Sequence, residues 1–198
     1  MSNPSAETFK QIYLEKFDKY ILRDGATDLR VWLLANDFFT APSSTKYHSD
    51  HEGGLCEHSV YVFNQMCRLL RSYTEIKTTG ETAAIITLLH DVCKIGCYTK
   101  EKKSRKTGRM LSNGKAEWED YWGYSWNEQF PYGNHGGKSV FLIERFMRLT
   151  EEEAVAIQCH MGNEDGKYGV SESYRQYPLA WLLHVADEAA AYLDEKER

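Results

Sequence analysis

The sequence predicts an all-α protein, a helical bundle with one irregular or short β-hairpin excursion near residues 98–134. Apolar residues recur at three- and four-residue steps in most segments outside that excursion. Two capping-box signatures indicate helix starts, Thr78-x-x-Glu81 and Thr150-x-x-Glu153. The chain has 198 residues, 42% of them apolar and 27% charged, which suits one globular domain and is short for two. We therefore expect a single domain over residues 1–198.

The N-terminal helices are expected within residues 7–39. Residues 7–22 carry apolar side chains at the spacing of an amphipathic helix, and residues 29–39 form a second, shorter pattern of that kind. Ala41-Pro42 then breaks the pattern, because proline cannot continue a helix.

The core that carries the candidate ligands is expected over about residues 47–195. A long helix begins near Leu55 and carries His58 on its first turns. Helices resume at about Lys138, and the last one begins near Pro178, a residue that suits the first turn of a helix. The apolar run 83–89, which follows the first capping box, predicts a buried helix that ends at His90-Asp91.

The excursion contains two unusual stretches. Residues 100–109 hold six basic side chains and one acidic one without a clear period, which is typical of a solvated loop, or of a flap that attracts a polyanionic substrate. Residues 118–132 are rich in aromatic side chains, which either cover the open end of the bundle or stack on a base.

The totals limit the partners. A net charge of −5 argues against broad binding of large nucleic acids or anionic membranes, although it leaves room for a local basic patch. No apolar run approaches the length of a membrane span, and residues 1–7 lack the basic flank and apolar core of a signal peptide. With five cysteines and no Cys-x-x-Cys pair, we expect a cytoplasmic protein with reduced thiols and no membrane partner.

The dipeptide His90-Asp91 is the strongest chemical signal. Two adjacent metal-ligand side chains at the end of an apolar run cost free energy unless they are paired or bind a metal. Imidazole and carboxylate ligands suit transition metals at hydrolytic sites. We expect one metal site from six residues of five segments, namely His58, His90, Asp91, His135, His160 and Asp187. Asp91 is best placed to bridge two divalent ions, whose identity among Fe, Mn, Zn, Ni and Mg is open.

The charge of such a site favours an anionic substrate. Two divalent ions bring four positive charges and the two aspartates neutralise two, so a phosphate group is attracted. A metal-bound hydroxide is the natural nucleophile, because a bound cation lowers the pKa of water. We assign catalytic roles to Asp91 and Lys94, and substrate contacts to Lys94, Lys138 and His184.

Three runs resemble a known family. The resemblance is to the HD-domain metal-dependent phosphohydrolases. It rests on residues 53–59 (GGLCEHS), 88–94 (LLHDVCK) and 183–187 (LHVAD). The order His, His-Asp, His, His, Asp resembles the binuclear branch of that superfamily, and the overall likeness is to stand-alone bacterial HD hydrolases. A Pro-Tyr-Gly-His-Gly-like turn of those enzymes is one residue longer here, at residues 131–140.

The resemblance implies an all-helical HD domain. It implies that His58, His90, Asp91 and Asp187 are the core metal ligands, and that His135 and His160 bind a second metal. It also implies hydrolysis of a phosphate ester or anhydride, with a small phosphorylated substrate such as a nucleotide or short oligonucleotide.

Each assignment has a plainer alternative. His90-Asp91 alone could be a buried polar pair that caps a helix, and His160 a core histidine. His135 could contact substrate, His184 could pack against the core, and Lys94 could be a cation at a helix C-terminus. At the level of function, the alternatives are a non-catalytic nucleotide- or metal-sensing HD module, and a nucleic-acid-binding module that uses the basic run.

Overall fold

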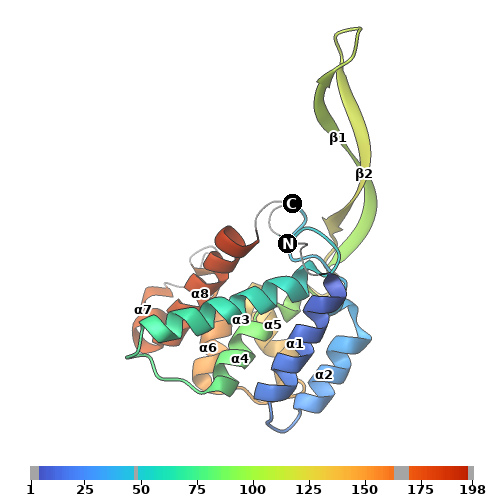
Figure 1. The fold of residues 1–198 in the computed structure, drawn as a ribbon. Coiled ribbons are helices and arrows are strands. Elements are labelled where there is room, and N and C mark those ends of the chain that lie inside the picture. Colours follow the sequence, from blue (N-terminus) through green and yellow to red (C-terminus); the bar gives the residue numbers. More distant parts are fainter. Residues whose placement is uncertain (1–4, 47–48, 163–169, 196–198) are drawn as a thin grey trace.

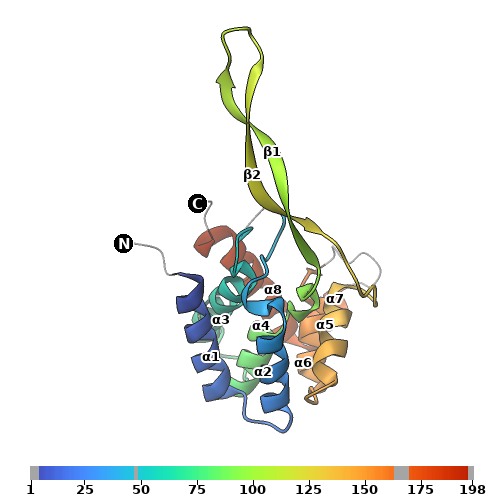
Figure 2. The ribbon, with the colours of Figure 1, turned by 90° about the vertical axis from the view of Figure 1, so that its right-hand side faces the viewer.

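Helix α3 packs against α1, α4 and α8 in a helical body from which one β-hairpin projects (Figures 1 and 2). The computed structural model describes residues 5–46, 49–162 and 170–195. The helices of the described chain are α1 (Ala6–Tyr20), α2 (Ala26–Ala35), α3 (Gly54–Ser72), α4 (Gly80–Leu88), α5 (His135–Glu144), α6 (Glu151–Cys159), α7 (Val170–Gln176) and α8 (Pro178–Ala189). Short helical turns complete the body, η1 (Asp37–Phe39), η2 (Val92–Lys94) and the π-helical η4 (Ala190–Asp194). A mostly helical fold with a hairpin is therefore confirmed.

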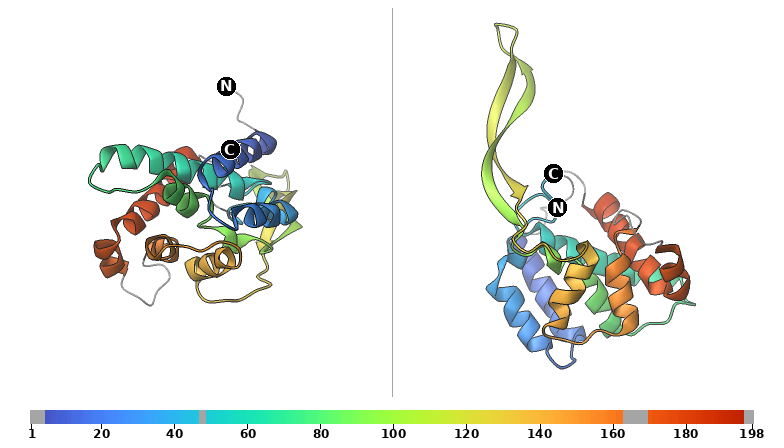
Figure 3. Two further views of the ribbon diagram at one scale, coloured as in Figure 1. Left: turned by 90° about the horizontal axis from the view of Figure 1, so that it is seen from below. Right: turned by 180° about the vertical axis from the view of Figure 1, so that it is seen from behind.

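The core lies where α3 packs against α1, α4 and α8, and where α6 packs against α5 and α8. Figure 3 shows α5 and α6 side by side on the face opposite to α1. Tyr13, Leu55, Ile85 and Leu183 are fully buried at these contacts. Burying an apolar side chain of this size contributes about 1.5–3 kcal/mol, so the interlocking helices hold the segments of the site in place.

The helix starts follow local side-chain chemistry. The capping box Thr150-x-x-Glu153 is confirmed at the start of α6, with both reciprocal hydrogen bonds. The other capping-box prediction is wrong, because Thr79 and not Thr78 accepts the hydrogen bond from the backbone at Thr82. Glu81 is instead engaged by the backbone N–H groups of Leu22 and Arg23. Tertiary contacts therefore shift this cap by one residue.

Helix α4 ends at Leu88, two residues before His90, and His90-Asp91 lie in the turn between α4 and η2. The Tyr13 hydroxyl donates a hydrogen bond to the carbonyl of Leu88 at 2.9 Å. The ring of His90 donates to the carbonyl of Thr87 at 2.8 Å. These two groups satisfy carbonyls that the end of a helix leaves unpaired, which explains why the helix stops before His90.

The excursion is a regular antiparallel hairpin of β1 (Tyr98–Met110) and β2 (Ala116–Trp126). At about 3.3 Å per residue, β1 is roughly 40 Å long and extends well beyond the helices (Figure 1). The expectation of a loop over residues 100–109 is wrong, because these residues form most of β1. Neither face of the outer hairpin is buried, so the apolar alternation of a half-buried strand is missing from the sequence.

Candidate metal centre

The fold brings all six predicted ligands into one cluster from five segments. His58 comes from the second turn of α3, and His90-Asp91 from the turn after α4. His135 is the first residue of α5, while His160 directly follows α6 and Asp187 lies on α8. His58, His90, Asp91 and His160 are buried, and only His135 and Asp187 keep some exposure.

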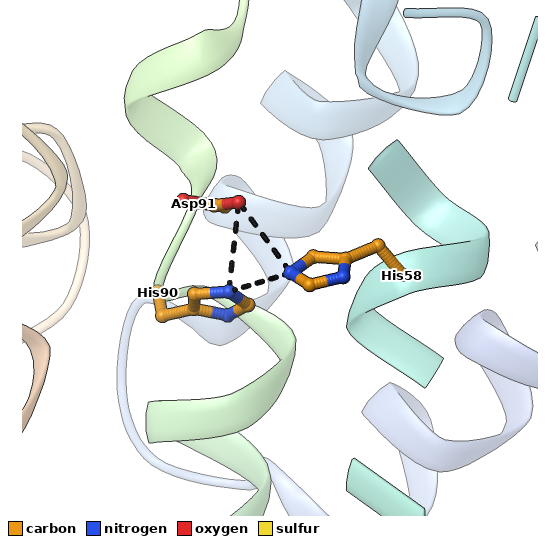
Figure 4. Close-up of side chains that lie close together, drawn as sticks. All are labelled: His58, His90 and Asp91. Carbon is orange, nitrogen blue, oxygen red and sulfur yellow. Dashed lines mark hydrogen bonds and ion pairs between the residues drawn. The ribbon is translucent and has the colours of Figure 1, made fainter. Parts of the chain in front are cut away.

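One side of Asp91 faces a largely buried group of donors. Asp91 Oδ2 lies 3.7 Å from His58 Nε2 and 3.5 Å from His90 Nε2. The two imidazole nitrogens are 3.2 Å apart, and Asp187 Oδ1 lies 3.0 Å from His58 Nε2 and 3.8 Å from His90 Nε2. Figure 4 shows His58, His90 and Asp91 converging on one point. We call these four side chains the inner group.

The other side of Asp91 faces a second pair of histidines. Asp91 Oδ1 lies 2.6 Å from His135 Nε2 and 3.5 Å from His160 Nε2. Cys93 Sγ lies 3.5 Å from the His135 ring nitrogens and could add a thiolate ligand. Because each oxygen of one carboxylate faces a different set of imidazoles, Asp91 has the position of a bridging ligand between two ions. We call His135, His160 and Asp91 Oδ1 the outer group.

His90 and His160 are oriented by the same local device. Each follows the end of a helix and donates from Nδ1 to the carbonyl three residues earlier, Thr87 at 2.8 Å and Ile157 at 2.7 Å. A carbonyl only accepts, so Nδ1 carries the proton in both rings and Nε2 is free to bind a metal when the ring is neutral. The hydrogen bonds at the C-terminal ends of α4 and α6 thus hold the Nε2 atoms of His90 and His160 toward Asp91.

Glu195 is a member of the site that the sequence analysis missed. Its Oε1 lies 2.6 Å from His58 Nδ1, and its Oε2 accepts a hydrogen bond from Ser49 at 2.5 Å. A carboxylate behind a metal-binding histidine fixes the ring and raises its basicity. Glu195 follows a helix in a polar C-terminal stretch, and its sequence context carries no signal for this role.

The pKa values reflect how tightly these charges are packed. Burial works to lower the pKa of His58, but Glu195 and Asp187 outweigh it and raise that pKa to about 10. Burial dominates at His90 and lowers its pKa to about 4. Burial opposes the charge of Asp91, yet Lys94 and the neighbouring histidines hold the pKa of Asp91 well below its usual range. His58 is therefore charged without a metal, and a bound divalent ion would have to displace its proton before the site offers two carboxylates and neutral imidazoles as ligands.

The polar atoms of the cluster are not all satisfied within the protein. Among the described residues, His160 Nε2 is buried and finds no hydrogen-bond partner. Asp91 Oδ1 lies 3.5 Å from this nitrogen. A divalent cation between them would give His160 Nε2 a partner, so the residues fit the metal that the sequence predicts.

The predicted substrate contacts lie at different distances from this centre. Lys94 Nζ pairs with Asp91 Oδ2 at 2.7 Å, so it belongs to the cluster. Lys138 Nζ pairs with Glu128 at 2.9 Å in a neighbouring cavity. The His184 ring hydrogen-bonds to the carbonyl of His160 at 2.7 Å and stacks on Tyr174, so in the structure it supports the outer group from behind.

A cavity of about 230 Å³ leads to the outer group. Its lining includes His135, Cys93, Lys138, Trp126 and Tyr132. Because His135 is the most exposed ligand, a substrate would reach the centre from this side.

Comparison with protein-family models, curated proteins and solved structures gives no match for this chain. Within the described residues, none of the helices is both long enough and apolar enough to cross a membrane. The chemistry of the site therefore has to be argued from its own geometry.

Proposed function

We propose that the protein is a metal-dependent phosphohydrolase of the HD type, with two divalent ions that share Asp91. The observation that carries the proposal is the division of the Asp91 carboxylate, with Oδ2 toward His58 and His90 and Oδ1 toward His135 and His160. The three sequence runs that resemble HD-domain enzymes supply the inner group, which supports assigning the fold to that superfamily.

When bound, divalent ions would supply a water of lowered pKa as nucleophile and positive charge for the phosphoryl oxygens. The protein's own part is to hold those charges in place. Asp91 and Asp187 neutralise only part of the charge of two ions, so the site attracts an anion. Glu195 orients His58, and the carbonyls of Thr87 and Ile157 orient the two other buried histidines.

The cations near the site suit phosphate oxygens. The ammonium of Lys94 lies beside Asp91, where it can turn to a phosphoryl oxygen once a metal occupies the carboxylate. Lys138 faces the cavity, and its charge is held by Glu128. We infer a phosphate ester or anhydride of a nucleotide or short oligonucleotide as the substrate.

The test is a screen of purified protein, loaded separately with Mn, Fe, Co, Ni, Zn and Mg, against phosphomonoesters, phosphodiesters and nucleoside triphosphates. We expect the metal-loaded protein to release phosphate, or phenolate where the substrate is a phenyl ester. A metal chelator should abolish this release. Nucleotide or metal binding without turnover under all these conditions would instead indicate a sensing module, and would overturn the proposal.

A further inference from the structure

The hairpin joins the two unusual stretches of the sequence, the basic run and the aromatic run, on a single face. In the antiparallel register, Tyr124, Trp122 and Trp118 of β2 lie directly opposite Lys100, Lys102 and Lys106 of β1. Paired residues point to the same face of a sheet, and so do residues two apart along a strand. Each of these three aromatic rings therefore has a lysine beside it on the same face. We call this face, with Trp126 at its base, the aromatic–lysine face.

The three tryptophan rings of this face are open to solvent, whereas Tyr124 is only 9% exposed. Trp118 is 58% exposed, Trp122 is 68% exposed and Trp126 is 48% exposed. The lysine ammonium groups lie close to the rings, with Lys106 5.6 Å from the centroid of Trp118 and Lys100 5.9 Å from that of Tyr124. Support of the hairpin by cross-strand pairing does not require large rings with this much surface in water.

The charge of the hairpin differs in sign from that of the remaining chain. Residues 98–126 contain seven basic and four acidic side chains, a net charge of +3, whereas the whole chain carries −5. The other residues therefore carry −8. On the aromatic–lysine face, the paired register holds three lysines and one acidic side chain, Asp120, which pairs with Lys102 at 2.7 Å. Lys100 lies 3.3 Å from Glu52, at the base of the hairpin. The paired strands of this face therefore keep a net charge of +2 in an otherwise acidic protein.

The opposite face of the hairpin lacks this pattern. Arg105 pairs with Glu119 at 2.7 Å, and Lys103 lies 3.8 Å from Glu101, so its charges balance. Its one ring between the paired strands, Tyr121, is covered by the Arg105 guanidinium at 5.0 Å. The two faces thus offer a built-in comparison within one element.

We propose that the aromatic–lysine face binds single-stranded nucleic acid. Exposed rings interleaved with cations are the arrangement that stacks on unpaired bases while neutralising the phosphates between them. Bases inside a duplex are already stacked and do not offer their faces to such rings. A protein or a second copy of this chain would find the positive field less complementary than a polyanion would.

The base of this face continues toward the metal centre. The ring of Trp126 packs on Tyr98 with centroids 5.3 Å apart, and Trp126 also lines the cavity that contains His135. A strand laid along the hairpin would deliver its end to that cavity. This second step rests on the proposed phosphohydrolase function, and it makes an oligonucleotide the substrate class.

The binding test uses the full chain with chelator present, so that no turnover occurs. A labelled 12-nucleotide single strand of DNA or RNA, and a matched duplex, are titrated by fluorescence anisotropy. We expect the single strand to bind more tightly than the duplex. The W118A/W122A variant should weaken binding by at least about tenfold, because each base–ring stack typically contributes that much or more. Y121A, on the opposite face, is the matched control and should change binding less than about twofold.

A second variant keeps the tryptophans and changes the charge. K102E/K106E should weaken binding and reduce the slope of its salt dependence by about 1.4, because two phosphate contacts are lost at about 0.7 per contact on single strands. Circular dichroism of each variant confirms that the helical body is intact. The proposal is overturned if the wild type does not bind single strands, if Y121A is as harmful as W118A/W122A, or if the tryptophan variant only converts a dimer to a monomer.

Hydrolysis distinguishes this inference from the proposed function. With metal added, W118A/W122A should lose at least about tenfold in cleavage of a limiting oligonucleotide, yet keep its rate on bis(p-nitrophenyl) phosphate within about twofold. If the wild type binds the oligonucleotide but cleaves neither substrate, the proposed phosphohydrolase function is contradicted, whereas the binding of single strands by the aromatic–lysine face is supported. Equal loss on both substrates would instead contradict the delivery of the strand by the hairpin.

Discussion

The protein holds two clusters of charged side chains, one partly buried around Arg23 and one buried around Asp91, and they differ in whether their polar atoms find partners inside the protein. Arg23, in the turn after α1, contacts α4 and α6 through Glu153 at 2.7 and 2.8 Å and Glu81 at 3.3 Å. Every oxygen of these two carboxylates accepts at least one hydrogen bond. The cluster at Asp91 instead leaves His160 Nε2 without a hydrogen bond among the described residues.

The difference shows how structural charges can be told from ligand sites by the contacts that they make inside the protein. A buried cluster whose atoms are all paired is complete and stabilises the fold. A cluster of converging imidazoles and carboxylates that leaves a buried imidazole nitrogen without a hydrogen bond could hold a cation. The comparison predicts that mutations in the first cluster change stability, whereas mutations in the second change metal binding and turnover.

The largest effect is expected at Asp91. Asp91→Ala removes the one carboxylate that faces both histidine groups, so turnover should fall at least about a thousandfold and bound metal should be lost. Plasma mass spectrometry and a phosphodiester assay measure the two changes. Asp18→Ala, which removes an exposed partner of Arg30, is the control and should change neither. Full activity of the Asp91→Ala variant would show that Asp91 is not part of the active site.

Arg23→Ala should act on stability alone. It leaves the buried Glu153 carboxylate without its main partner, which typically costs about 3–5 kcal/mol in the free energy of unfolding. Urea unfolding measures the loss, and metal content at a temperature where the variant is folded should equal that of the wild type. Arg175→Ala, at an exposed pair with Glu172, should cost less than about 1 kcal/mol. If the folded Arg23→Ala variant binds less metal than the wild type, the Arg23 cluster is not purely structural, and the distinction between the two clusters is contradicted.

Glu195→Gln sharpens the comparison, because Glu195 touches a ligand but does not face the ions. It should weaken metal binding about 10- to 100-fold through the orientation and basicity of His58. Competition with a metal-sensitive dye measures the affinity, and the exposed Glu188→Gln on the neighbouring helix is the control. Equal affinity in both variants would show that Glu195 has no role in the site.

The smallest effect is the acid response of the structural cluster. Burial opposes the charge of Glu153, but hydrogen bonds from Arg23 and Thr150 lower its pKa below the ordinary value of 4.5. A carboxyl group with a lowered pKa in the folded state stabilises the protein above its unfolded pKa. That stability is lost as the pH falls through the folded pKa. Urea midpoints from neutral pH to about pH 3 should therefore fall more steeply in the wild type than in Glu153→Gln. Parallel curves would contradict this assignment.

The sequence predicts the helical segments and the six candidate ligands because both depend on local patterns. Apolar periodicity locates α1, α3 and α8, and a His-Asp pair after an apolar run stands out from its surroundings. The end of α4 is missed because Tyr13, far away in the sequence, takes the carbonyl of Leu88. Glu195 is missed because only the fold brings it to His58.

The hairpin shows a different limit of sequence reasoning. Strand prediction relies on alternation between a buried and an exposed face, and the outer hairpin has no buried face. On β2 the tryptophans lie on one face together with Asp120, while Tyr121 lies on the other, and the pattern becomes visible only once the register places Lys102 beside Trp122. Pairing, rather than either stretch alone, creates the aromatic–lysine face.

The central claim is that two ions share Asp91, and metal stoichiometry tests it most directly. The measurement is plasma mass spectrometry of wild type, His135→Ala and Asp91→Ala after loading with the metal that gives most activity and removal of excess. The account predicts two ions per chain in the wild type, one in His135→Ala because the inner group is untouched, and none in Asp91→Ala. One ion per chain in both the wild type and His135→Ala would contradict it.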